Sequence, residues 1–256
     1  MRTGPGRLPA WRVRRVASTG STNSDLLSAA AAGEPAGAVL VADEQTAGLG
    51  RLGRRWLTPP GSALAVSMLL RPDRVDGWLP LTTGLAVRDA VLACAPGLAV
   101  ALKWPNDVLA GPRGADPTGK LAGILVQGGP AGAVVIGCGV NVTVPVHALP
   151  PRVGATSLTL LGADVDREQL LGVLLARLAV RLDAWSAGRS AVAEYRAACA
   201  TLGREIAITA IDRVVTGRAV DVDTDGRLIV ESADGRVALA AGDVAHVRPE
   251  RPPWAS

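Results

Sequence analysis

Hydrophobic residues change their spacing along this chain of 256 residues, and the change falls near residue 203. Before that point, segments with a helical period of about 3.6 residues alternate with short apolar runs of strand length. Beyond it only short β runs remain, and Asp225-Gly226 and Asp234-Gly235 are typical hairpin turns between them. The pattern predicts a mixed α and β region followed by a small β barrel.

Four segments have helical patterns. The first is "GSTNSDLLSAAAAGEPAG", where hydroxyl and amide residues begin the helix and glycine and proline end it. The others are expected at 78–95, at 166–186 and around 190–201. In the third of the four, leucines repeat at i, i+3, i+4 and i+7, and Asp166 with Gln169 has the spacing of a capping box.

Apolar runs bounded by turn residues predict strands at 38–42, 62–72 and 98–105. Two further runs, "KLAGILVQ" and "AVVIGCGVNVTV", are separated by "GGPAG" and predict a hairpin. The glycine- and proline-rich stretch 111–119 is expected to be a loop.

The change in pattern and the composition together suggest three parts: a disordered basic tail (1–15), a mixed domain (16–202) and a small β domain (203–256). No apolar run approaches the roughly 20 residues that span a bilayer, and the basic start leads into no apolar core of the signal-peptide kind. We therefore expect a cytoplasmic protein with no membrane attachment. The net charge of +4 argues, weakly, against a dedicated nucleic-acid binder.

Lysine and asparagine are scarce in this chain. Of the 27 basic residues only two are lysines and the other 25 are arginines, and there are three asparagines. Because arginine can replace lysine wherever charge alone matters, the remaining lysines are candidates for sites that need a compact charge. The scarce residues all lie in four motifs, "GSTN", "KWPND", "GKLAG" and "GCGVN": Asn23, Lys103, Asn106, Lys120 and Asn141.

A further segment, "ADEQTAGLGRLGRRW" (42–56), combines glycines with arginines, which suits close approach to an anion. The chain thus offers cationic groups, backbone amides and a carboxylate able to bind magnesium, but no pair of nucleophile and base. His147 and His246 lie outside every motif, and the three cysteines match no metal pattern. "GADPTGK" fits the start of a P-loop, but Leu121 stands where a P-loop needs Ser or Thr. We expect catalysis by positioning and charge neutralisation.

Taken in order, "GSTNSDLL", "EQTAGLGRLGRRW", "LKWPNDVL", "GKLAGILVQ" and "VIGCGVNV" resemble the biotin protein ligase family over about residues 16–160. The resemblance implies an α+β fold: an SH2-like, class II synthetase-like catalytic domain with a mixed sheet and flanking helices, and a C-terminal SH3-like β barrel. It also implies a two-step reaction. Biotin and MgATP give biotinyl-5′-AMP, which is then transferred to a lysine of the biotin carboxyl carrier protein.

The resemblance assigns roles to individual residues. Lys120 and Arg51 are the expected catalytic residues, and Asp107 is the expected magnesium ligand. Biotin is expected to contact Ser21, Thr22, Asn23, Gln45, Gly48, Leu49, Gly50, Arg51, Lys120, Gly123 and Gly139. ATP is expected to contact Arg51, Arg54, Trp56, Lys103, Asn106, Asp107 and Asn141.

The chain departs from the family pattern in three places. Leu49 stands where the family has arginine, Gln127 stands where many relatives carry a carboxylate that could be a second magnesium ligand, and the insertion 111–119 has no assigned role. Only some twenty residues precede "STN", so we expect a monofunctional ligase without DNA binding, whose partner is the carrier protein of acyl-CoA carboxylases. A weak homodimer is an open alternative.

Two rival functions remain open. A lipoate ligase or octanoyltransferase would share the fold, and the transferase would need a cysteine such as Cys138. A non-catalytic module that senses biotin or nucleotide is the alternative from another class.

Overall fold

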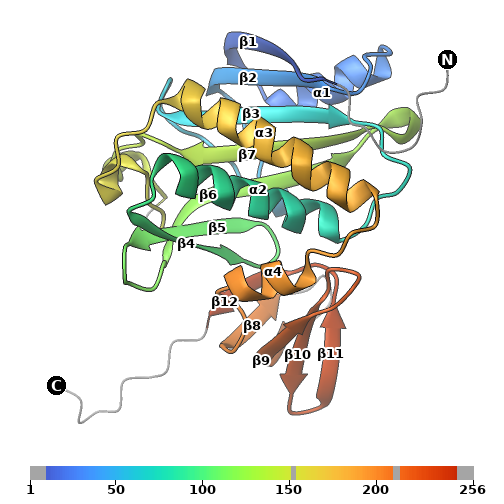
Figure 1. The fold of residues 1–256 in the computed structure, drawn as a ribbon, viewed down its shortest axis with the longest axis vertical. Helices are drawn as coiled ribbons and strands as arrows, with labels where there is room; N and C mark the ends of the chain where they lie inside the picture. The colour runs from blue at the N-terminus through green and yellow to red at the C-terminus, as the bar shows by residue number, and fades with distance from the viewer. Residues whose placement is uncertain (1–9, 151–153, 210–213, 247–256) are drawn as a thin grey trace.

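The computed structural model describes residues 10–150, 154–209 and 214–246, and every structural statement below concerns these residues (Figure 1). Their four α-helices are α1 (Thr22–Ala31), α2 (Trp78–Cys94), α3 (Arg167–Ser186) and α4 (Val192–Ala198). Short 3₁₀ turns are η1 (Arg51–Gly53), η2 (Pro130–Gly132), η3 (Val146–Ala148) and η4 (Thr159–Leu161).

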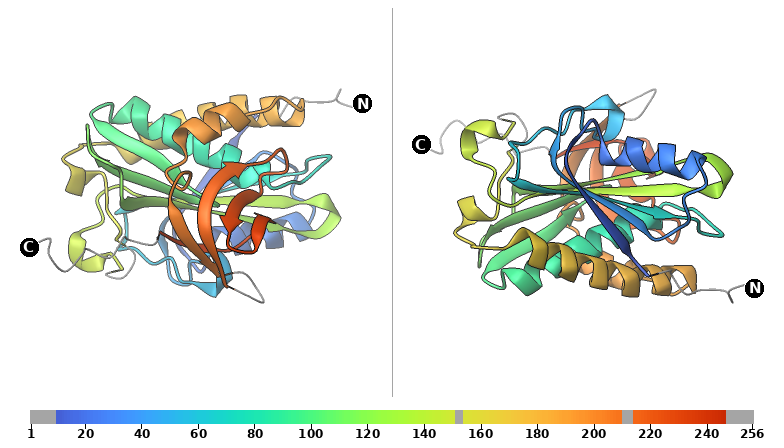
Figure 2. Two further views of the ribbon diagram at one scale, coloured as in Figure 1. Left: turned by 90° about the horizontal axis from the view of Figure 1, so that it is seen from below. Right: turned by 90° about the horizontal axis from the view of Figure 1, so that it is seen from above.

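Seven strands form one mixed sheet in the order β1-β2-β3-β7-β6-β5-β4. Their bounds are β1 (Arg12–Thr19), β2 (Ala38–Gln45), β3 (Ala63–Leu70), β4 (Leu98–Lys103), β5 (Asp107–Pro112), β6 (Gly119–Gly128) and β7 (Val134–Asn141). Only β1 and β2 pair in parallel, and every other neighbouring pair is antiparallel. Helices α2 and α3 cover one face of this sheet and α1 lies on the other (Figure 2).

A second sheet follows α4, in the order β11-β10-β9-β8-β12. All of its pairs are antiparallel. The bounds are β8 (Glu205–Thr209), β9 (Val214–Val222), β10 (Leu228–Ser232), β11 (Gly235–Leu239) and β12 (Asp243–His246). The predicted fold class is therefore confirmed: a mixed α and β domain with a small C-terminal antiparallel sheet.

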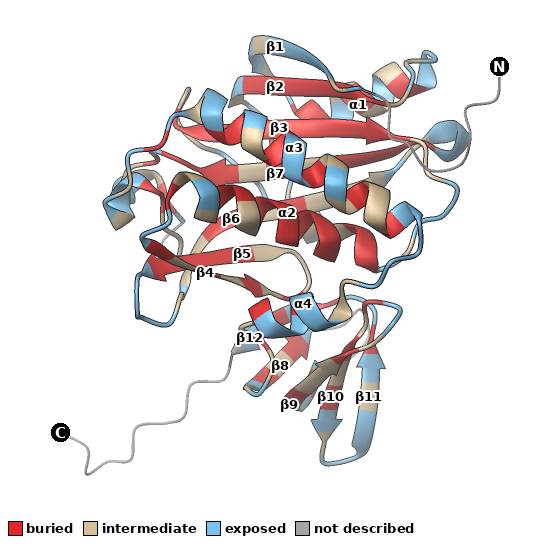
Figure 3. Ribbon diagram, in the orientation of Figure 1, coloured by how far each residue is buried: buried red, intermediate tan, exposed pale blue. Residues whose placement is uncertain are grey.

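Alternate side chains along β7 point to opposite faces of the sheet and pack in different clusters. Ile136 and Cys138 belong to the main core, which fills the space under α2 and α3, whereas Val135 packs with Leu26 of α1 on the other face. Figure 3 shows that β3 is buried along its whole length and that β7 and α2 are buried for the most part. Because Gly137 and Gly139 share the face of Val135, the α1 side of β7 carries no side chain at these two positions.

Most of the predicted elements are confirmed. Helix α1 begins after Ser21, whose side chain accepts from the backbone N–H of Ser24, and α3 begins after Asp166, which accepts from the N–H of Gln169 at 2.8 Å. The predicted hairpin around "GGPAG" forms, with β6 and β7 paired antiparallel. No α-helix of the described part of the chain is both long and apolar enough to cross a bilayer.

Two predictions about local structure were wrong. Residues 12–15 were assigned to a disordered tail, but they form half of β1, the edge strand of the sheet. Its exposed arginines hide the strand pattern; Arg12 pairs with Glu34 and Arg15 with Glu168. The loop predicted at 111–119 is also shorter than expected, because β5 continues to Pro112.

Tryptophans fix the C-terminal sheet to the first domain. Trp78 at the start of α2 donates its indole N–H to the carbonyl of Thr224 at 2.8 Å, and Trp104 donates to Gly226 at 3.0 Å. Both acceptors lie in the turn between β9 and β10. Trp104 is 1% exposed, so the tryptophan of "KWPND" serves the contact between the two sheets.

Candidate active site

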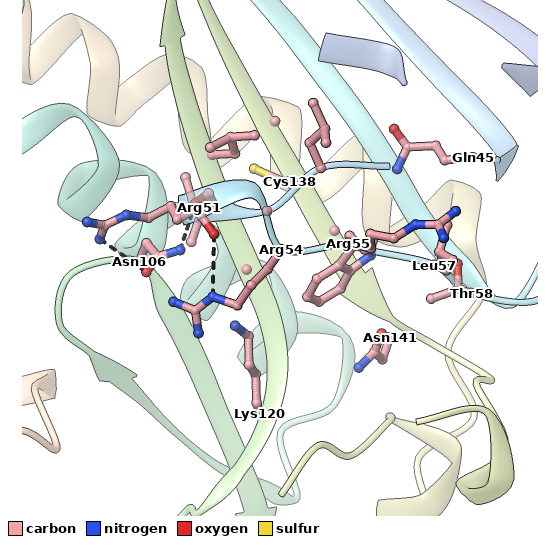
Figure 4. A pocket seen from close by; sticks show the side chains of 18 of the residues that line it. Gln45, Arg51, Arg54, Arg55, Leu57, Thr58, Asn106, Lys120, Cys138 and Asn141 are labelled. Atoms are coloured by element: carbon pink, nitrogen blue, oxygen red, sulfur yellow. Dashed lines mark hydrogen bonds between the residues drawn. The ribbon is translucent and has the colours of Figure 1, made fainter. Parts of the chain in front are cut away.

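A pocket opens on the α1 face of the mixed sheet, between the ends of β2, β6 and β7 and the segment that follows β2 (Figure 4). Fifteen of the residues predicted for the site line it: Ser21, Thr22, Asn23, Gln45, Leu49, Gly50, Arg51, Arg54, Trp56, Asn106, Asp107, Lys120, Gly123, Gly139 and Asn141. Gly48 and Lys103 do not. Residues as far apart in sequence as Ser21 and Asn141 thus meet in one cavity.

Residues 48–56 form a small β-hairpin over the pocket, which we call the lid hairpin. The N–H of Trp56 donates to Gly48 O at 2.8 Å, and the N–H of Gly50 donates to Arg54 O at 2.6 Å. Leu49 pairs with Arg55 between these bonds. The backbone alone therefore closes the hairpin, and Leu49 takes part in it through its main chain.

Gly48 has a structural reason to be glycine. A Cβ at this position would lie 2.2 Å from the carbonyl oxygen of Trp56, which no side chain can tolerate. Gly48 was predicted to contact biotin, but in the structure it allows the two strands of the lid hairpin to approach each other.

Trp56 rests on two glycines of the sheet. A Cβ at Gly139 would lie 2.5 Å from the indole Cε2 and Nε1 atoms, and one at Gly123 would lie 3.2 Å from Cζ3. The Lys120 ammonium lies 5.7 Å from the centre of the ring. The indole N–H is buried and has no hydrogen-bond partner among the described residues. Such a donor is costly unless something accepts from it, so it suits an acceptor atom of a bound ligand.

Uncharged polar groups surround the pocket at its Gln45 end. The Gln45 Oε1 atom accepts from the backbone N–H of Thr22 at 2.9 Å and lies 3.0 Å from the Thr22 hydroxyl. Ser67 Oγ lies 2.7 Å from the Thr22 hydroxyl and 2.6 Å from Asn23 Oδ1. The hydroxyls of Thr22 and Ser67 can each donate one hydrogen and also accept. This end offers both donors and acceptors without charge.

The other end of the pocket is cationic, and Figure 4 shows Lys120 and Arg51 across the pocket from Gln45. Lys120 Nζ lies 2.6 Å from Asp107 Oδ1, and both side chains are less than one-fifth exposed. Arg51 donates to Asn106 Oδ1 at 3.4 Å. Burial lowers the pKa of the Arg51 guanidinium, but an arginine retains its charge under all ordinary conditions.

Asn106 and Asn141 are held by the neighbouring backbone. The Asn106 side chain donates to Ile124 O at 2.9 Å, which ties the turn between β4 and β5 to β6. Asn141 donates to Thr156 O at 2.9 Å and is 3% exposed. Both amides are thus fixed in orientation at the wall of the pocket.

Lys103 lies behind the cationic end. It is opposite Asp107 in the β4–β5 register, does not line the pocket, and burial lowers its pKa. Its predicted contact with ATP stays a prediction. In the present structure Lys103 adds positive charge next to Asp107.

Magnesium fits this site only together with a ligand. No group of three or more His, Cys, Asp or Glu residues that could hold a metal exists among the described residues. Asp107 supplies one carboxylate at the cationic end. Mg²⁺ is commonly held by one or two carboxylates plus substrate phosphates, so the residues fit an ion that arrives with a nucleotide.

Sequence reasoning missed two residues that shape the site, Ser67 and Asp243, and the contact made by a third, Gln127. Ser67 is a lone hydroxyl inside the apolar run "ALAVSMLL", which is a usable signal. Asp243 of β12 lines the pocket and forms an ion pair with Arg54 at 3.0 Å, but its "GDV" context gives no hint of this. Gln127 stands out in the sequence because many relatives carry a carboxylate there, and in the structure it accepts from Asn23 Nδ2 at 2.7 Å, at the uncharged end of the pocket.

Comparisons with known proteins agree with this geometry. The model of the "Biotin/lipoate A/B protein ligase family" matches residues 14–141, and that of the "Biotin protein ligase C terminal domain" matches residues 201–247. A biotin–[acetyl-CoA-carboxylase] ligase of Mycobacterium tuberculosis is 42% identical over 93% of this chain and 90% of its own length. A ligase of the same name from Paracoccus denitrificans is 37% identical over 66% of this chain and 74% of its own.

A solved structure shows the same fold. The biotin protein ligase from Aquifex aeolicus in complex with biotin and ATP is similar with a TM-score of 0.78 and 26% identity, over 93% of this chain and 99% of that one.

Proposed function

This chain belongs to the biotin/lipoate A/B protein ligase family, and from that premise we propose that it is an ATP-dependent biotin–[acetyl-CoA-carboxylase] ligase. It activates biotin as biotinyl-5′-AMP and transfers the biotinyl group to a lysine of a carboxylase carrier protein. The cytoplasm is the proposed location of this reaction.

The observation that carries the proposal is the order of chemical groups along the pocket. One end offers uncharged donors and acceptors around Gln45 and Asn23, the middle is a glycine floor, and the other end carries Lys120 and Arg51. Biotin has the matching order, with a neutral cyclic urea at one end and a carboxylate at the other. ATP then meets the carboxylate at the cationic end.

At the uncharged end, Gln45 and Asn23 each keep a hydrogen-bonding group that can bind the ligand. Gln45 Oε1 is already used by Thr22, so its NH₂ group is available to donate to the urea carbonyl. Asn23 Oδ1 can accept from a urea N–H. Both are held in place by neighbours, which limits the entropy lost on binding.

At the cationic end, the first step is the attack of a biotin carboxylate oxygen on the α-phosphorus of ATP. The bond from that phosphorus to the bridging oxygen breaks, and pyrophosphate leaves. Lys120 and Arg51 supply positive charge where the two anions meet, which reduces their repulsion and stabilises the charge that develops on the phosphoryl oxygens. Arg54 is placed to contact the phosphates. Asp107 would hold the Mg²⁺ that accompanies ATP and neutralises part of its charge.

In the second step, the amine of the carrier lysine attacks the carbonyl carbon of the mixed anhydride, and AMP leaves. The pocket contributes no covalent intermediate. Its role is to keep the adenylate under the lid hairpin until the carrier arrives, because the same cationic groups that receive the phosphate also retain it.

The thiol of Cys138 argues against an octanoyltransferase. It belongs to the core on the α2 and α3 side of the sheet, and burial raises its pKa to about 12. A thiol with that pKa is not a thiolate near neutral pH, and the thiolate is the nucleophile.

Biotin-dependent exchange of pyrophosphate into ATP tests the proposal, with lipoate and octanoate run in parallel. Exchange with biotin alone is expected. Exchange driven by lipoate would favour the rival ligase, and no exchange with any acid would favour a sensing module and overturn the proposed function.

A further inference from the structure

Gln127 is a partly buried amide beside the uncharged end of the pocket that takes no part in the steps above. It lies near the end of β6 and does not line the pocket. Its Oε1 atom accepts from Asn23 Nδ2 at 2.7 Å. Two residues earlier on the same strand, the carbonyl of Leu125 accepts from the same nitrogen at 3.3 Å. Any effect of Gln127 on a ligand must therefore pass through Asn23.

The Asn23 amide has all of its hydrogens directed toward β6. A primary amide carries two N–H donors and one carbonyl acceptor with two lone pairs. Gln127 and Leu125 take the two donors, and Ser67 contacts the carbonyl oxygen at 2.6 Å. That oxygen lies only 2.3 Å from where a Cβ of Gly137 would be. The bare Cα of Gly137 thus gives the Asn23 oxygen its place at the floor of the pocket.

The opposite orientation of this amide would be unfavourable. It would put the Asn23 oxygen against the carbonyl of Leu125, a backbone acceptor that cannot turn, and direct the NH₂ group at the pocket. The Gln127 amide can turn to match either orientation, so Leu125 sets the direction of the Asn23 amide and the shorter bond to Gln127 strengthens it.

We propose that Gln127 is a positioning residue: it holds Asn23 in the orientation in which the carbonyl oxygen faces the pocket, and thereby sets the affinity for a cyclic urea. The identity of this ligand as biotin rests on the proposed function. A pocket end that presents NH₂ from both Gln45 and Asn23 could serve the urea carbonyl but would have no amide acceptor for its N–H groups.

The test is biotin affinity measured by calorimetry for the wild type, Gln127→Leu and Gln127→Glu. Gln127→Leu removes the acceptor and should weaken binding about tenfold, in line with the loss of one hydrogen bond, or about 1.4 kcal/mol. Gln127→Glu presents an oxygen in every rotamer and should stay within about threefold of wild type. KM for ATP, and kcat at saturating biotin, should change less than about twofold in both, because the cationic end is untouched.

Two controls separate positioning from a general structural effect. Gln169→Leu is the same chemical change on the exposed surface of α3, and it should leave biotin affinity unchanged. In an Asn23→Ala background, Gln127→Leu should cause no further loss, because the residue through which Gln127 acts is gone. If Gln127→Leu melts at a lower temperature than wild type, Gln127→Met replaces it.

Three results would overturn the inference: wild-type affinity in Gln127→Leu, equal losses in Gln127→Leu and Gln127→Glu, or a full loss in the Asn23→Ala background. Calorimetry does not depend on catalysis. A wild-type protein that binds biotin but exchanges no pyrophosphate therefore overturns the proposed ligase while the variant affinities still decide the role of Gln127. A wild-type protein that does not bind biotin overturns both.

Discussion

Gly139→Ala should displace Trp56 and with it the lid hairpin. The added Cβ would lie 2.5 Å from two indole atoms and 2.9 Å from a third. Carbon atoms in contact are normally about 3.5–4.0 Å apart, so the ring must withdraw by about 1 Å. The sheet strand β7 is buried and paired on both sides, whereas between its ends the hairpin is held by side-chain contacts such as Arg51 with Asn106 and Arg54 with Asp243. The hairpin is therefore the part that moves.

The size of the effect follows from the energy of overpacking. Inserting a methyl group where none fits destabilises by about 1–3 kcal/mol, and here that energy opposes the closed position of the lid. At 1.4 kcal/mol for each factor of ten, kcat/KM for ATP in pyrophosphate exchange should fall about five- to 150-fold. Gly123→Ala meets the same ring at 3.2 Å, where a shift of a few tenths of an ångström suffices, so its loss should be less than about fivefold.

The assay compares these two variants with Gly97→Ala, whose added Cβ would have no neighbour within 4 Å and which should behave as wild type. The decisive comparison is the double variant. In a Trp56→Leu background the clash no longer exists, and Gly139→Ala should add less than about a twofold loss. An undiminished effect of Gly139→Ala without the indole would refute this reasoning, because the glycine would then be needed for something other than Trp56.

Three further changes test other parts of the site. Lys120→Arg keeps the charge opposite Asp107 but replaces a point charge by a wide fork, so adenylation should fall on the order of 100-fold in a protein that melts as wild type; normal exchange rates would contradict the assignment of Lys120. Cys138→Ala should retain ligase activity. Since burial raises the pKa of Cys138 from 9.0 to about 12, only the unfolded state loses this proton between those values. The wild type should therefore lose up to about 1.4 kcal/mol of stability per pH unit there, and the variant correspondingly less in alkaline urea titrations. Asp243→Asn should lower KM for ATP about two- to fivefold by freeing Arg54 from a half-exposed ion pair; a higher KM would mean that Asp243 assists binding.

Local patterns in the sequence predicted most elements, and the failures have physical causes. The helices and the β6–β7 hairpin follow from periodicity and turn residues that act within a few positions. Strand β1 is at the edge of the sheet and is largely exposed on both faces, so it shows no alternation of apolar and polar residues. Strand β5 follows directly on the "WPND" turn and ends at Pro112, so its apolar part is too short to distinguish from a loop.

For the site too, some features could be predicted from the sequence and others could not. The resemblance of five motifs to a known family assigned most of the residues that line the pocket, and four of the five scarce lysines and asparagines, all but Lys103, line it as well. What the motifs could not predict were partners across the fold. Gln127 reaches Asn23 from a strand more than 100 residues later in sequence, and Asp243 reaches Arg54 from the other sheet. Such pairings depend on how the sheets pack, which short motifs do not encode.

Leu49 can now be understood from the way the lid hairpin is held. An arginine at this position could act by ordering the hairpin or by adding charge. Ordering does not need it, because backbone bonds on either side of Leu49 close the hairpin. Added charge would act at the mouth of the pocket, where the side chain is 42% exposed and solvent screening weakens it. Arg51 and Arg54 lie on the same hairpin, contact Asn106 and Asp243, and supply the charge nearer to the reacting groups. The lid therefore needs a backbone that can close at position 49 more than it needs a cation there.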